Sequence, residues 1–75
     1  MKGGQQMYKN LVAEMARAGF TNKALAEKIN IGEVAFGKKV NEVVDWKINE
    51  MVAVQNVINS ENGTSHSLDY FFKKF

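Results

Sequence analysis

Residues 21–40 read TNKALAEKINIGEVAFGKKV, and this stretch decides between a helical fold and a mixed one. Two glycines bracket a short apolar run in which Val34 and Phe36 are two residues apart, the spacing of a half-buried strand. Val40, however, follows Phe36 by four residues, which puts both side chains on one face of a helix. Because the flanking sequence is also helical in pattern, the spacing predicts a helix over 33–40.

The residues before this helix predict another one, joined to it by a tight turn. Thr21 can cap a helix over 22–29 because its hydroxyl can accept an amide hydrogen of the first turn. Asn30 follows, and asparagine is one of the few residues besides glycine that adopt the left-handed backbone conformation. The small Ala26 lets the next helix approach closely. Two short helices joined in this way are typical of a helix-turn-helix.

The remainder of the chain extends the helical pattern to a whole all-α domain. Apolar residues recur at helical spacing, and the sequence contains no proline. A polar connection is expected over 59–67, with Asn62-Gly63 as its tight turn and more mobility than the rest of the interior. The expected fold is a compact bundle of five short helices in one domain over 7–75, behind a flexible leader over 1–6. The expected helices cover 7–18, 22–29, 33–40, 48–59 and 68–73.

Composition limits the classes of protein to which this chain can belong. Ten lysine plus arginine residues against eight acidic residues give a net charge of +2, which permits an anionic partner without requiring one. There is no cysteine, so the sequence offers no disulfide framework and no thiolate metal site, and we expect a cytoplasmic protein. No apolar run is long enough for a signal peptide or a membrane span. We therefore expect no membrane partner.

An enzyme is not expected from this sequence. His66 is the sole histidine, and with Ser67 and Asp69 it lies in a polar loop that runs into a helix. A solvated loop residue and a helix cap explain these residues better than a nucleophile and its base, which need a fixed geometry. The sequence has neither a glycine-rich phosphate loop nor metal-ligand spacing. We expect no catalytic residue, metal, cofactor or small-molecule ligand.

The stretch LVAEMARAGFTNKALAEKINIGEVAFGKKVN, residues 11–41, resembles the lambda-repressor-like, Xre-type helix-turn-helix family, especially its short phage and mobile-element members. That family typically has a threonine, a Leu-Ala-Glu run, a Gly-Ile-Ser turn, and a recognition helix ending in an apolar residue and Asn-Gly. The tail SLDYFFKK, residues 67–74, resembles the family's C-terminal ending. The resemblance covers nearly the whole chain.

Four positions depart from the family pattern. Asn30 stands where a turn glycine is usual, and Gly32 stands where a serine usually caps the recognition helix. Glu42 occupies a position where glycine often follows that helix. Lys47 replaces a threonine that often caps the fourth helix, which leaves Asp45 as a less regular candidate for that cap.

The resemblance implies a sequence-specific regulator of phage repressor or Cro type that binds double-stranded DNA with residues 33–40 in the major groove. The start of the preceding helix would then meet a phosphate. In the groove, Glu33 could accept from a cytosine amine, Val34 could pack on a thymine methyl and Lys38 could donate to guanine. The expected DNA-binding residues are Thr21, Asn22, Lys23, Gly32, Glu33, Val34, Gly37, Lys38, Lys39, Asn41 and Lys47.

Two questions about partners stay open at the level of sequence. A second interpretation keeps the scaffold but binds protein instead of DNA, and the low net charge with the acidic Glu33 and Glu42 favours it. The C-terminal segment is also denser in aromatic residues than one short helix can bury. It either packs against the first and fourth helices or forms a homodimer contact. Its aromatic residues are Tyr70, Phe71, Phe72 and Phe75.

Overall fold

The computed structural model describes residues 8–75, and over that range the chain forms five helices and no strand. None of these helices is both long enough and apolar enough to cross a bilayer. The expected all-α fold is confirmed, with each expected helix present. The expected leader and residue 7 lie outside the described residues. The helices are α1 (Lys9–Ala18), α2 (Asn22–Lys28), α3 (Glu33–Val40), α4 (Ile48–Asn62) and α5 (Leu68–Phe71).

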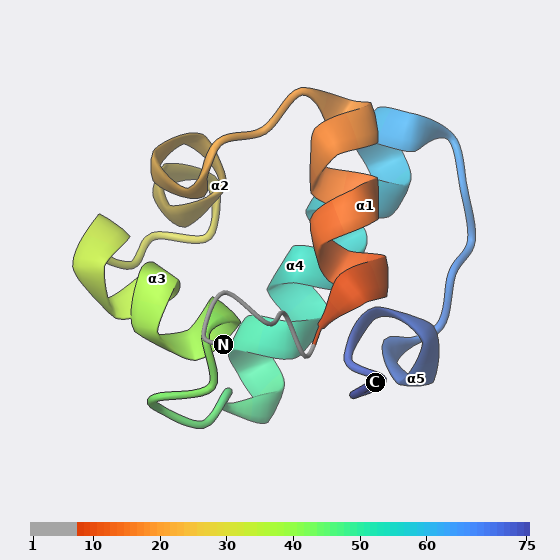
Figure 1. Cartoon of the computed structure of the whole chain (residues 1–75). Helices are drawn as coiled ribbons and strands as arrows, with labels where there is room; N and C mark the ends of the chain where they lie inside the picture. The colour runs from red at the N-terminus through yellow and green to blue at the C-terminus, as the bar shows by residue number, and fades with distance from the viewer. Residues whose placement is uncertain (1–7) are drawn as a thin grey trace.

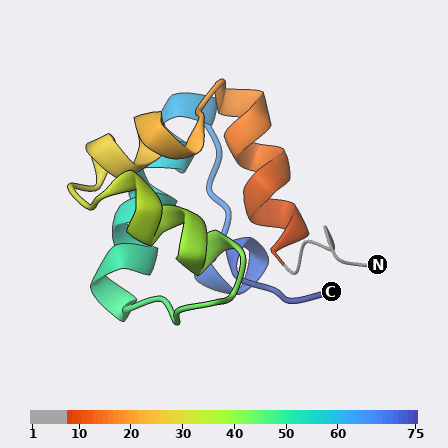
Figure 2. The same cartoon turned by 60° about the vertical axis from the view of Figure 1, so that its left-hand side comes forward.

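Helix α4 lies at the centre of the bundle, with α2 and α3 on one side and α1 and α5 on the other (Figure 1). Helix α1 packs against α4, and α5 packs against both of them. Helices α2 and α3 pack against each other and lie at the outside of the bundle in both views (Figures 1 and 2). The α2 and α3 pair is therefore the most outlying part of the described chain.

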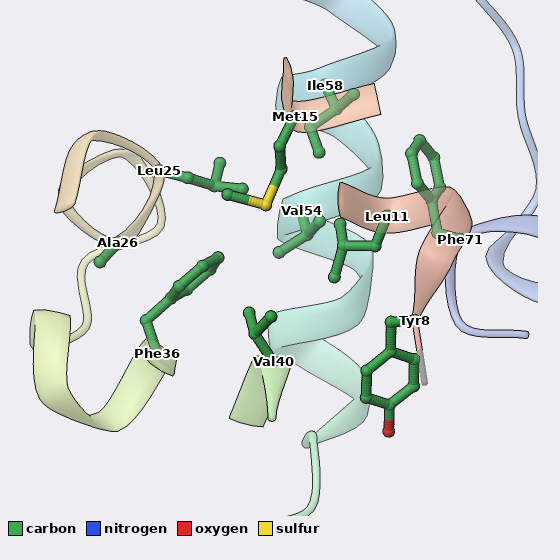
Figure 3. Close-up of a cluster of buried hydrophobic side chains, with 10 residues drawn as sticks. All are labelled: Tyr8, Leu11, Met15, Leu25, Ala26, Phe36, Val40, Val54, Ile58 and Phe71. Atoms are coloured by element: carbon green, nitrogen blue, oxygen red, sulfur yellow. The ribbon is translucent and has the colours of Figure 1, made fainter. Parts of the chain in front are cut away.

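The core draws apolar side chains from all five helices (Figure 3). Trp46, in the loop before α4, connects its two halves, because its ring packs edge-on against Phe36 at 5.5 Å and against Phe72 at 5.2 Å between centroids. Burial of these side chains supplies most of the free energy that holds such a small bundle together. The buried apolar residues are Tyr8, Leu11, Met15, Leu25, Ala26, Phe36, Val40, Val54, Ile58 and Phe71.

Most of the C-terminal aromatic residues are buried in this core or packed against it. Phe71 is fully buried, and Tyr70 and Phe72 pack against the buried cluster. Their packing on α1 and α4 is thus confirmed. Phe75 is the one aromatic side chain of residues 8–75 that stays exposed, at 49%. Little apolar surface is left in this segment for a second copy of the chain.

The expected caps are present at the starts of α2 and α5 but not at the start of α4. Thr21 caps α2 by accepting the Ala24 N–H at 3.0 Å, and Ser67 caps α5 by accepting the Tyr70 N–H at 3.1 Å. Gly19 ends α1 in the left-handed conformation. At α4, Lys47 is the residue before the helix and the Glu50 carboxylate accepts its N–H at 2.9 Å. Asp45 is therefore not the cap.

The polar connection after α4 is shorter than expected and is held by hydrogen bonds. Helix α4 continues to Asn62 and ends at Gly63, which is left-handed with φ 64°. Asn59 then fixes the chain, because its side-chain oxygen accepts from the Thr64 hydroxyl at 2.8 Å and from the His66 N–H at 3.1 Å. The helix therefore runs three residues beyond the expected end at 59 before the left-handed Gly63 stops it. Helix α5, in contrast, ends at Phe71 rather than at 73.

A buried carboxylate joins α1, α4 and α5. Glu14 is 1% exposed and accepts from the Tyr70 hydroxyl at 2.8 Å and from the Asn62 side-chain amide at 3.1 Å. The hydrogen bond from the Tyr70 hydroxyl to Glu14, together with burial, raises the pKa of Tyr70. His66 stacks on the Tyr70 ring at 4.0 Å, and its Nε2 lies 3.5 Å from a Glu14 oxygen. His66 lies in the loop, as expected, but its side chain is only 32% exposed because it packs on this cluster.

Candidate nucleic-acid interface

The turn between α2 and α3 is built around a left-handed asparagine. Asn30 has φ 65°, and the following Ile31 N–H donates to the Ala26 carbonyl at 3.0 Å. The turn leads directly into α3, whose Phe36 and Val40 reach inward to the core (Figure 3). With its inner side anchored in this way, α3 turns its other side to solvent.

The outward side of α3 is open and carries small and polar residues. Glu33, Val34, Ala35 and Lys38 are all exposed, and Val34 reaches 72%. At Gly37 a Cβ atom would find no other atom within 4 Å, so the backbone itself is accessible there. An exposed helix of this width fits the major groove of B-DNA, where side chains can reach base edges.

The two neighbouring lysines of α3 differ in their exposure to solvent. Lys38 is exposed and makes no ion pair within residues 8–75. Lys39 is buried at 6%, with its ammonium 3.0 Å from the Glu50 carboxylate and donating to the Asp45 carbonyl at 3.1 Å. A phosphate contact from Lys39 does not fit this placement, because its ammonium would have to leave Glu50.

The partner of Lys39 is held in its charged form. Burial raises the pKa of Glu50, but the Lys47 backbone N–H and the Lys39 ammonium outweigh it, so the pKa lies below its usual value. The Lys39 and Glu50 pair therefore joins the end of α3 to the first turn of α4 through the intervening loop. This tie fixes the orientation of α3 relative to the centre of the bundle.

The start of α2 lies beside the end of α3. Thr21, Asn22 and Asn41 line one hollow of about 240 Å³, with apolar side chains of α1 and α3 among its other walls. Since the Thr21 oxygen accepts the Ala24 N–H, its own hydrogen remains available to donate. Lys23, next in sequence, is exposed. The structure thus brings together three of the residues expected to contact DNA from two different helices.

The remaining expected residues are exposed but separate from this hollow. Gly32 precedes α3 and caps it without a side chain, and Lys47 precedes α4. A second hollow of about 470 Å³ lies between α2 and the C-terminal half of α4, and none of the expected DNA-binding residues lines it. Its walls include Phe20, Lys28 and Glu61. Lys28 is therefore an exposed lysine of α2 that lies away from the candidate interface.

Sequence reasoning misplaced one residue and omitted another. Lys39 follows Phe36 by three residues, so helical spacing alone already favours the inner side for both. Ala35 was omitted, although it is exposed beside Val34.

No protein-family model, curated protein or solved structure matches this chain.

Proposed function

We propose that this chain is a cytoplasmic, sequence-specific regulator that binds double-stranded DNA through a helix-turn-helix formed by α2 and α3. The observation that carries the proposal is the exposed side of α3, whose inner side is fixed by Phe36, Val40 and the Lys39 ammonium. A rigidly held helix with an accessible outer side is what reading of the major groove requires.

Each contact has a role set by its position. Val34 and Ala35 pack on thymine methyl groups, Lys38 donates to guanine, and Glu33 selects cytosine by accepting from its amine. Gly37 allows the α3 backbone to approach the bases closely.

A second group of contacts goes to the DNA backbone. Thr21, Asn22 and Lys23 bind a phosphate at the start of α2, and Asn41 contributes at the end of α3. Lys47 is a further phosphate contact, whereas Lys39 is left out of the set because Glu50 holds it.

Two measurements test this proposal. Bound duplexes are first selected from a random pool, and their affinities are then measured over a salt series. With two phosphate contacts from lysine, those of Lys23 and Lys47, log K should fall against log salt with a slope of about −2. Lys38→Ala should weaken binding at least about tenfold and relax the selection of guanine at the base pair that Lys38 contacts. Lys28→Ala is the matched control, because it removes an exposed lysine of α2 outside the interface, and it should bind as the unchanged chain does.

A protein-binding module on the same scaffold is the alternative. Two residues of α3 favour it. Glu33, at the start of the helix, is acidic and would be repelled by the DNA phosphates. Val34 is 72% exposed and would add little binding energy unless a thymine methyl group lay beside it. No detectable duplex binding at low salt, or equal affinity for Lys38→Ala and the unchanged chain, would replace the DNA proposal with this one.

A further inference from the structure

The pair Asn62-Gly63 combines a reactive sequence with a fixed position at the end of α4. Asn62 is the one asparagine of the sequence that glycine follows. Asparagine deamidates most readily before glycine, because glycine has no side chain to hinder attack by its backbone nitrogen on the asparagine side chain. Asn62 is the last residue of α4, and Gly63 ends the helix with φ 64°. The pair is therefore a candidate site of chemical modification.

Deamidation exchanges the side-chain nitrogen of Asn62 for an oxygen of water. The Gly63 nitrogen forms a bond to the Asn62 Cγ atom, the bond from Cγ to Nδ2 breaks, and ammonia leaves with the Gly63 amide hydrogen. Water then opens the resulting succinimide ring at either carbonyl, which gives aspartate or isoaspartate. Nothing is oxidised or reduced, and water is the only co-reactant. Either product has a carboxylate where the folded chain has an amide.

The folded chain holds both reacting groups in other hydrogen bonds. The Asn62 Nδ2 donates to the Glu14 carbonyl at 3.2 Å and to the Glu14 carboxylate at 3.1 Å. The Gly63 N–H donates to the Asn59 carbonyl, which also accepts the Thr64 N–H at 3.0 Å. Attack requires these bonds to break. The reaction therefore proceeds from molecules in which the end of α4 has opened.

The new carboxylate would face one that is almost closed to water. Glu14 is 1% exposed, and its two oxygens accept from the Asn62 amide and the Tyr70 hydroxyl. The basic groups beside it are Arg17 at 3.8 Å and His66 at 3.5 Å, with 63% and 32% of their side chains exposed. Neither is a buried cation that could offset a second negative charge. Deamidation thus replaces a donor by a like charge, which is costly in a buried site.

The same carboxylate fastens α5 to α1. The connection over 63–67 leads from the end of α4 to α5 (Figure 1). In α5, the Tyr70 hydroxyl donates to Glu14 at 2.8 Å, and the Tyr70 carbonyl accepts from the Asn10 side chain at 2.9 Å. If Glu14 turns away from a second carboxylate, the Tyr70 hydroxyl loses its acceptor.

We propose that Asn62 is a deamidation site, and that its conversion to aspartate or isoaspartate loosens α5 from α1. The folded chain delays the reaction through the hydrogen bonds of Asn62 and Gly63, so the modification marks molecules that have opened at the end of α4. The inference does not depend on DNA binding, because no residue of the candidate interface takes part in it.

Mass spectrometry of the whole chain, kept in mildly alkaline buffer with and without urea, tests the first part of the inference. Each deamidation raises the mass by about 1 Da, and peptide mapping locates it. We expect the change at Asn62 in both samples. It should be at least about tenfold slower in the folded chain, because only opened molecules react.

Urea unfolding of variants tests the second part. Asn62→Asp reproduces the aspartate product and should lower the urea midpoint by at least about 1 M, because two carboxylates then meet in a buried site. Asn56→Asp is the matched control, since it makes the same change at an exposed asparagine of α4. It should move the midpoint by less than about 0.3 M.

Glu14→Gln separates charge repulsion from the loss of a hydrogen bond. Combined with Asn62→Asp, it removes one of the two facing charges and supplies an amide that can donate to the other. The double variant should therefore recover most of the midpoint that Asn62→Asp loses. If Asn62→Asp does not fold at all, a folded double variant still supports the inference.

Four results would overturn the inference. Two concern the reaction, namely no deamidation at Asn62 in urea, or equal rates in the folded and the urea-unfolded chain. Two concern its effect, namely equal midpoints for Asn62→Asp and Asn56→Asp, or a double variant no more stable than Asn62→Asp. Failure to bind a duplex would remove the proposed function and leave all four measurements unchanged.

Discussion

At the scale of single residues, the left-handed Asn30 sets the turn between α2 and α3. A side chain with a Cβ is strained at φ 65°, and asparagine tolerates this conformation better than alanine does. Asn30→Ala should therefore lower the free energy of unfolding by about 1 kcal/mol. Asn30→Gly, which needs no strained Cβ, should stay within about 0.5 kcal/mol of the unchanged chain. Urea unfolding measures both, and an unaffected alanine variant would show that the turn is not constrained at this residue.

Residue type predicts some of these special positions and not others. Asn30 could be placed in the turn because asparagine is one of the few residues that accept it. Glu42 adopts nearly the same conformation with φ 63°, and nothing in a glutamate predicts that. Its carboxylate pairs with the Lys74 ammonium at 2.9 Å, a contact with a residue far along the chain. Such long-range partners are not visible in a local pattern.

At the scale of the element, α3 combines low intrinsic stability with an open backbone. Gly37 lies inside the helix, and a Cβ there would meet no atom within 4 Å. Gly37→Ala should raise the free energy of unfolding by about 0.5–1 kcal/mol, because glycine loses more backbone freedom on folding.

If α3 binds DNA as proposed, the same variant should weaken duplex binding, since the added methyl group would lie where the α3 backbone approaches the bases. Unfolding by urea and titration with a selected duplex measure the two effects on one protein. A gain in stability with unchanged affinity would remove Gly37 from the interface.

Helical spacing predicted the elements well, whereas side-chain partners between elements were beyond its reach. The starts of α2, α3, α4 and α5 were expected at the residues where they occur, because caps and apolar periodicity are local signals. The burial of Glu14 depends on Tyr70, which is 56 residues away. The path of the chain after α4 likewise depends on the hydrogen bonds that Asn59 makes to Thr64 and His66. For the candidate site, spacing predicted the exposed side of α3 but not the pairing of Lys39.

At the scale of the whole molecule, the Lys39 and Glu50 pair should make stability depend on pH in acid. Because the pKa of Glu50 is lowered in the folded chain, its contribution is fully present above its ordinary value of 4.5. That contribution is lost as pH falls through the pKa that Glu50 has in the folded chain. Unfolding free energies measured between about pH 7 and about pH 3 should therefore fall less steeply for Glu50→Gln than for the unchanged chain.

Glu61→Gln serves as the control for this prediction, since it removes an exposed carboxylate from the same helix. It should follow the pH dependence of the unchanged chain. Parallel curves for all three proteins would show that the pair does not connect α3 to α4 energetically.

The net charge of +2 would give the proposed DNA binding only a modest electrostatic attraction that does not depend on sequence. With Lys39 held by Glu50, the candidate interface keeps Lys23, Lys38 and Lys47 as its cations. On the proposed function, affinity would then come mainly from base contacts of α3 and, if two copies associate, from paired half-sites about one helical turn apart.

We propose that the outward side of α3 contacts DNA. Backbone amide shifts recorded by NMR, as a selected duplex is added to the whole chain, test it most directly. We predict that the largest changes fall on residues 32–38 and 21–23, with smaller ones at Asn41 and Lys47. Changes absent from α3, or confined to other parts of the bundle, would contradict the account.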